Sequence, residues 1–318
     1  MCCAGLSATR EPTLSPRHCT HVTQLFGVFT VIEGSLSTNP SDAAMLRPTA
    51  LALALFLSTP VWAGPPLPSC YAGLYLGEPE RTTKHAYYLF VDQTTPLTPA
   101  LKTNVADLTA NWGSDGERVK IVRFSANVAG QYTELMFDEF SDPPPTQEYL
   151  FHLRAEDKPK LLECIKARDA KFHKQLNQAV SQTLTLSNGK LPKTDLLNAL
   201  KELATKMLMP ESTYDQTVLL VSDGLENSNY ASFYQRKTII KPIDVHKTLD
   251  EISKFNLIPN WHGAKVYMFG LGYLHDDKIY ANPKMLQPLK DFWQSYFSLG
   301  KAQLMELGTP ELLVSTLK

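Results

Sequence analysis

Two aspartates and two threonines stand at positions where their oxygens could hold a hard metal ion. Asp92 and Thr94 follow one continuous apolar run, Asp223 follows a second such run, and Thr194 precedes a predicted helix. Ligands of parallel sheets lie at the carboxyl ends of the strands. Carboxylate and hydroxyl oxygens, with water, suit hard divalent cations. The sequence therefore predicts that these four side chains converge on Mg²⁺, or on Mn²⁺ or Ca²⁺.

Each of these residues also has a simpler interpretation. Thr94 and Thr194 could cap helices, as Ser and Thr often do. Asp223 and the glycine after it could form a turn, and Asp92 could hydrogen bond to its own loop. Only their convergence at one sheet edge would favour a binding function.

Asp92 also allows an enzymatic alternative. An aspartate after an opening strand can be a phosphoryl-accepting nucleophile, as in phosphatases of the haloacid dehalogenase type. Those enzymes carry a second aspartate two residues later, where this chain has Thr94, so the acid/base partner is absent. The sequence contains no zinc-protease motif, nucleophile elbow or phosphate-binding loop. We therefore expect a binding protein, with a phosphatase-like hydrolase as the alternative.

Strands and helices are predicted to alternate along the chain, which indicates a three-layer α/β/α sandwich with a mainly parallel central sheet. The predicted strands at 87–92 and 217–222 each contain a continuous apolar run, as expected of strands buried on both faces. The other predicted strands are 118–124, 131–140, 264–269 and 302–307. The predicted helices are 98–112, 158–183, 195–209, 245–255, 283–298 and a last one from Thr309. We expect one domain over 85–318, preceded by a segment, 64–84, with a possible edge strand at 71–76.

The N-terminal part resembles an export signal. Arg47 precedes a short apolar stretch at 50–57, and small residues lead to a cleavage position after Ala63. This order of charge, apolar core and small residues is typical of a secretory signal peptide, here 45–63. Residues 1–44 show no periodicity and are expected to lie upstream of the true start or to be a disordered extension. We expect a periplasmic or secreted protein.

Composition narrows the class of partner. The 318 residues carry a formal net charge of −1, which does not favour a nucleic-acid binder. The apolar stretch of the signal is too short to span a bilayer, so no stable membrane span is expected after its removal. We expect a protein partner in the cell envelope or outside the cell.

Two cysteines remain after the predicted cleavage, Cys70 and Cys164. An even pair in an oxidising compartment is a candidate disulfide, which could stabilise the fold by at most about 4–5 kcal/mol in the chain-entropy model. Two separate buried thiols are the alternative.

The order of these motifs resembles the von Willebrand factor type A domain and its metal-ion-dependent adhesion site. The family's Asp-x-Ser-x-Ser is similar to the stretch from Asp92 to Pro96, and Thr194 and Asp223 match its later elements. The resemblance implies that Thr94 and Thr194 bind the metal directly, while the aspartates act mostly through water. An acidic side chain of a partner would then take the open coordination position.

One residue departs from this pattern. Pro96 stands where the family has its second serine and offers no side-chain oxygen. A direct ligand is missing unless Thr95 or water replaces it, so the resemblance implies weaker metal binding than in the family.

The loop at 227–242 is the predicted partner-binding segment beyond the metal. It contains Tyr230, Phe233, Tyr234 and Arg236, residue types that are enriched at interfaces, and it leaves the strand end that carries Asp223. The alternative is that its aromatic rings fold back onto the core.

Overall fold

The computed structural model describes most of the chain after the predicted signal peptide. The described residues are 66–81, 84–95, 97–125, 133–185, 195–210, 214–236, 239–273 and 283–317. The predicted segments 1–44 and 45–63 lie outside them, as do Pro96 and Thr194.

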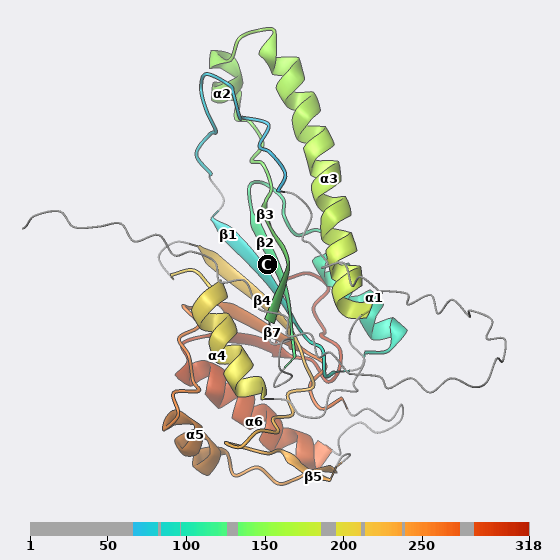
Figure 1. Cartoon of the computed structure of the whole chain (residues 1–318), viewed down its shortest axis with the longest axis vertical. Coiled ribbons are helices and arrows are strands. Elements are labelled where there is room, and N and C mark those ends of the chain that lie inside the picture. The colour runs from blue at the N-terminus through green and yellow to red at the C-terminus, as the bar shows by residue number, and fades with distance from the viewer. Residues whose placement is uncertain are drawn as a thin grey trace, which may run out of the picture. The chain divides into compact units, whose positions relative to one another are not determined.

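A six-stranded sheet, in the order β3-β2-β1-β4-β7-β8, forms the centre of the fold (Figure 1). Its strands are β1 (His85–Asp92), β2 (Arg118–Phe124), β3 (Thr133–Phe140), β4 (Asp215–Val221), β7 (Lys265–Phe269) and β8 (Gln303–Leu307). All neighbours are parallel except β2 and β3. The prediction of a mainly parallel sheet is confirmed. A separate antiparallel pair joins β5 (Tyr234–Arg236) to β6 (Ile239–Ile240).

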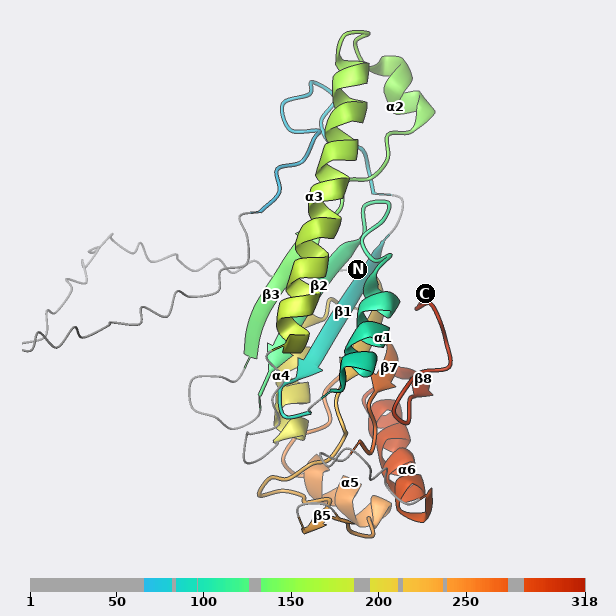
Figure 2. The ribbon, with the colours of Figure 1, turned by 90° about the vertical axis from the view of Figure 1, so that its right-hand side faces the viewer.

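Helices cover both faces of this sheet. They are α1 (Pro99–Thr109), α2 (Gln147–His152), α3 (Asp157–Thr185), α4 (Leu196–Met207), α5 (Val245–Ser253) and α6 (Pro283–Leu299). Figure 2 shows α1 and α3 on one face of the sheet, and α4, α5 and α6 lie toward the other. The predicted three-layer α/β/α sandwich is therefore confirmed.

The side chains of β1 pack alternately against the helices on the two faces of the sheet. Successive residues of a strand point to opposite faces. Tyr88 and Phe90 belong to the core cluster that includes α4 and α6, whereas Leu89 and Val91 belong to the cluster that includes α1 and α3. Because both faces are covered, an apolar side chain is favoured at every one of these positions.

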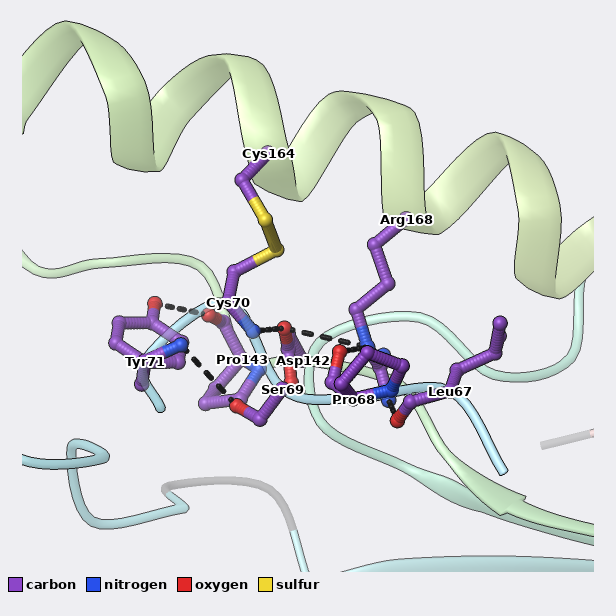
Figure 3. The surroundings of a disulfide bond; sticks show 9 residues. All are labelled: Leu67, Pro68, Ser69, Cys70, Tyr71, Asp142, Pro143, Cys164 and Arg168. Carbon is purple, nitrogen blue, oxygen red and sulfur yellow. Dashed lines mark hydrogen bonds and ion pairs between the residues drawn. A yellow bond between two sulfur atoms is a disulfide. The ribbon is translucent and has the colours of Figure 1, made fainter. Parts of the chain in front are cut away.

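The segment before β1 is fastened to α3 by a disulfide between Cys70 and Cys164 (Figure 3). The expected pairing of the two cysteines is present. Arg168, one helical turn further along α3, donates from Nε to the carbonyl oxygen of Pro68 at 3.0 Å and forms an ion pair with Asp142. The Asp142 carboxylate in turn accepts a hydrogen bond from the Cys70 N–H at 2.8 Å.

The possible edge strand at 71–76 is not formed, and these residues make turns instead. Ala72 N–H donates to Ser69 O and Leu74 N–H donates to Tyr71 O, each at 3.1 Å. The Tyr71 ring is buried, and its hydroxyl donates to Pro143 O at 2.6 Å. Turn hydrogen bonds and the disulfide to α3 therefore hold this segment without strand pairing.

The predicted last helix, starting at Thr309, is wrong. Gly308 N–H donates to Met268 O at 2.8 Å, Gly270 N–H donates to Pro310 O at 2.7 Å, and residues 308–317 form no helix. These backbone groups bond to the end of β7 and the turn after it, so they are not available for a helical turn. Within the described residues, no helix is long and apolar enough to cross a bilayer.

Candidate functional site

The candidate site lies where the two central strands end. β1 and β4 are parallel neighbours in which Val91 is opposite Val221. The following residues, Asp92 and Ser222, therefore come side by side at the carboxyl edge of the sheet. This is the edge at which parallel sheets bind ligands.

Asp92 is fully buried, and hydroxyl groups from both strand ends surround its carboxylate. Its Oδ1 accepts hydrogen bonds from the backbone N–H of Thr94 at 2.8 Å and from the Thr94 hydroxyl at 2.5 Å. Its Oδ2 accepts one from the Ser222 hydroxyl at 2.8 Å. The carboxylate thus has a fixed orientation and joins the loop after β1 to the end of β4.

A second set of bonds holds Asp223 beside this carboxylate. The Asp223 N–H donates to the Thr95 hydroxyl oxygen at 3.0 Å. Asp223 Oδ1 accepts from the Leu225 N–H at 2.9 Å, which fixes the side chain over its own turn. Asp92, Thr94, Thr95, Ser222 and Asp223 are therefore one connected group of oxygen-bearing residues.

The turn after Asp223 depends on glycine. Gly224 has φ of +71°, and a Cβ atom there would lie 2.7 Å from Nε1 of Trp293. The Trp293 Nε1–H donates to Gly224 O at 3.0 Å. A residue with a side chain would both strain the backbone and displace this indole, so the turn needs the glycine that the sequence provides.

Burial raises the pKa of the Asp92 carboxyl, and the hydrogen bonds from Thr94, Ser222 and Thr95 oppose that rise. The desolvated carboxylate would be stabilised by a positive charge nearby. Full burial and hydrogen bonds to both oxygens do not suit a nucleophile that must reach a phosphoester. The structure therefore does not favour the phosphatase alternative.

The start of α4 brings a further carboxyl to this region. Asp195 caps the helix by accepting from the Asn198 N–H at 3.3 Å, one residue later than the predicted cap, Thr194. Glu226, on the loop after Asp223, is fully buried, and its Oε2 accepts from the Leu197 N–H at 2.9 Å. The loop after β4 is thus bonded to the first turn of α4.

Three of the four predicted metal ligands, Asp92, Thr94 and Asp223, lie in or directly beside this network. Thr194 falls outside the described residues, next to Asp195. Sequence reasoning missed Ser222 and Glu226. The position of Ser222 at the end of an apolar strand, directly before Asp223, was a usable signal. Nothing in the sequence indicated Glu226, because a glutamate in a polar loop is ordinarily exposed.

The predicted partner-binding residues divide into different environments. Tyr230 is 37% exposed, its ring packs 4.7 Å from that of Phe255, and it lines a cavity of about 360 Å³. Phe233 is buried against Phe292 in the core, as the alternative interpretation expected, so its ring does not lie on the surface. Tyr234 and Arg236 lie in β5, and their side chains are outside what the structure describes.

The residues at the edge fit a hard cation in chemical type. The described part of the chain contains no group of three or more His, Cys, Asp or Glu side chains that could hold a metal. The edge instead combines two carboxylates with hydroxyl groups, which are oxygen donors of the kind that Mg²⁺ accepts together with water. The Thr94 hydroxyl donates a hydrogen bond to Asp92 Oδ1, which makes its oxygen a better electron-pair donor.

Comparison with protein-family models and with characterised proteins finds no match to the sequence. Solved structures align at low identity. The pilus adhesin SpaC of Lactobacillus rhamnosus GG, in an open conformation, matches 69% of the chain with 15% identity and a TM-score of 0.33. Another form of this adhesin matches 72% with 14% identity and a TM-score of 0.37. The matched regions are 27% and 29% of the adhesin, so the chain corresponds to less than a third of its length.

An aerotolerance-related membrane protein of Bacteroides fragilis matches 72% of the chain and is itself covered to 92%, with 12% identity and a TM-score of 0.31. At such identities and scores the similarities do not extend to function.

Proposed function

We propose that this chain is an exported interaction module of the von Willebrand A type that binds an acidic group of a protein partner through a weak Mg²⁺ site. The observation that carries the proposal is the hydrogen-bonded group at the carboxyl edge of β1 and β4. Asp92 and Asp223 lie on adjacent strand ends, and Thr94, Thr95 and Ser222 fix them there. If these residues only capped helices and formed turns, hydrogen bonds between the two strand ends would not be required.

In this proposal the residues have distinct roles. Thr94 is a partly exposed residue at the edge and, with Thr194, would bind the cation directly. Asp92 and Asp223 are buried and would act through water and by their negative charge. The Thr95 hydroxyl accepts a hydrogen bond from the Asp223 N–H, so in this proposal it holds Asp223 in place and does not replace the oxygen that Pro96 lacks. The missing ligand is the reason for weak binding.

The disulfide supports export. A bond between Cys70 and Cys164 persists in oxidising compartments and is rare in the cytosol. With the signal-like segment at 45–63, it supports a periplasmic or secreted location and a partner in the envelope or outside the cell. Mass spectrometry of the native protein should find an N-terminus near residue 64, and an N-terminus before Met45 would contradict export through this signal.

Removal of the Asp223 carboxylate is expected to weaken metal binding. Calorimetric titration of the purified protein with Mg²⁺ or Mn²⁺ should give a heat of binding in the wild type. Asp223→Ala should reduce the affinity by at least about tenfold, because a supporting carboxylate contributes that much at metal sites.

A matched control is Asp107→Ala, which removes an exposed carboxylate from α1. It should leave the titration unchanged. No heat in the wild type would leave a metal-free interaction domain, and equal losses in both variants would indicate a general effect of charge.

A further inference from the structure

We propose that the cavity between the loop at 228–233 and α5 is a separate binding site, which takes a short zwitterionic peptide of the size of a dipeptide. The cavity has a volume of about 360 Å³, at the lower end of the range for small-molecule sites. Its walls are the loop at 228–233, the segment 241–244 and the first two turns of α5. Neither Asp92 nor Asp223 lines it, so this site does not depend on the proposed metal site.

Hydrogen bonds hold the walls of this cavity in place without a ligand. The Ser228 N–H donates to Ala231 O at 2.9 Å, and the Ser228 hydroxyl oxygen accepts from the Tyr230 N–H at 3.1 Å. On the other side, Asp244 caps α5 by accepting from the Lys247 N–H at 3.1 Å. Because these walls are already ordered, binding costs less conformational entropy than it would in a flexible loop.

Groups of opposite charge line the cavity along α5. Lys247 and Glu251 are four residues apart, so they share a face of the helix with their Cβ atoms about 5–6 Å apart. Lys241 adds a second ammonium group from the segment before α5. Among the described residues, none of these three side chains has an ion pair or hydrogen-bond partner. Asp244 also lines the cavity, but its carboxylate caps α5. Two ammonium groups and the partly buried Glu251 carboxylate are therefore available to a ligand.

Asn229 provides a group that suits the middle of a peptide. Its carboxamide lines the cavity and has no partner among the described residues. A carboxamide can donate and accept hydrogen bonds, as the N–H and C=O of a peptide bond require. Asn229 can therefore pair with the peptide bond of a bound dipeptide.

The spacing and signs of the charges favour a dipeptide over simpler ligands. Two extended residues span about 7 Å at most, which suits an ammonium group at Glu251 and a carboxylate at Lys247, one helical turn away. A simple anion would be repelled by Glu251, and a simple amine would be repelled by the two lysines. The half-exposed ring of Tyr230 lines the cavity as well and offers an apolar surface to a side chain of the ligand.

The test uses the dipeptide alanyl-leucine in three forms: free, acetylated at its amino group, and amidated at its carboxyl group. Calorimetric titration of the purified protein in chelator measures the affinity for each form. We expect the free dipeptide to bind about tenfold more tightly than either blocked form, because each block removes one charged hydrogen-bonding group.

Variants assign each charge of the ligand to its partner. Glu251→Gln should bind the free and the acetylated dipeptide equally, while its preference for the free over the amidated form remains. Lys241→Met combined with Lys247→Met should show the reverse pattern. Asp250→Asn and Lys254→Met are the matched controls, because they remove charges near α5 that do not line the cavity. Both controls should keep the two preferences of the wild type.

Three results would overturn this proposal. They are no binding of the free dipeptide, equal affinity for its three forms, and loss of the preferences in the control variants. The first two are measured on the wild type alone, so they do not depend on how the variants fold. Because the titrations contain chelator, none of these results bears on the proposed Mg²⁺ site, and absence of Mg²⁺ binding would leave the dipeptide site standing.

Discussion

Replacement of both Cys70 and Cys164 by alanine is expected to lower the free energy of unfolding by about 4–5 kcal/mol. The bond closes a loop with a sequence separation of 94 residues, and the entropy that such a loop removes from the unfolded chain corresponds to this amount. The loop contains β1, β2, β3 and the start of α3, so the link restricts half of the sheet. Urea unfolding of the two proteins, followed by circular dichroism, measures the difference.

Reducing agent provides the control. It should lower the stability of the wild type to that of the double variant and leave the variant unchanged. A loss below about 1 kcal/mol would show that the disulfide secures only the segment before β1. That segment is also held to α3 by Arg168, which donates to Pro68 O and Phe140 O and pairs with Asp142. In that case Arg168→Met should release the segment in the reduced protein.

The fold was largely predictable because its central strands are buried on both faces. Continuous apolar runs mark β1 and β4, and helical spacing with a Thr-Pro start marks α1, which begins with Thr98 as cap. The predictions are wrong where hydrogen bonds between distant segments override the secondary structure that the local sequence favours. Thr309 and Pro310 are typical of a helix start, yet the backbone there bonds to the end of β7 and the turn after it. Such a contact between distant segments leaves no local pattern in the sequence.

The site was predictable in part for the same reason. Asp92 and Asp223 follow apolar strands, so parallel pairing brings them to one edge. The sequence did not reveal that Thr95 faces the Asp223 N–H or that Ser222 binds Asp92, because those contacts depend on the path of each turn. Glu226 was missed because burial of a charged loop residue follows only from what packs around it.

The free energy of unfolding of Glu226→Gln, relative to that of the wild type, is expected to increase by about 3 kcal/mol as the pH rises from 5 to 8. Burial, opposed by hydrogen bonds, raises the pKa of Glu226 from 4.5 to about 8 in the folded protein. Between these values the unfolded chain releases the proton while the folded chain keeps it. Stability from this group is therefore complete below about pH 4.5 and is lost as the pH approaches 8, at up to about 1.4 kcal/mol per pH unit.

Neighbouring groups do not remove this difference. The negative charge of Asp195, at the start of α4, raises the pKa of Glu226 further, but Asp195 is present in both proteins. Tyr296 of α6 has its pKa raised well above 10 by burial, so it stays neutral over this range. Urea unfolding in chelator at pH 5, 6, 7 and 8 isolates the contribution of Glu226 as the difference between the two proteins. If the difference in free energy of unfolding does not change with pH, Glu226 is ionised in the folded protein at every pH tested. The N-terminus of α4 would then offset the cost of burying its charge.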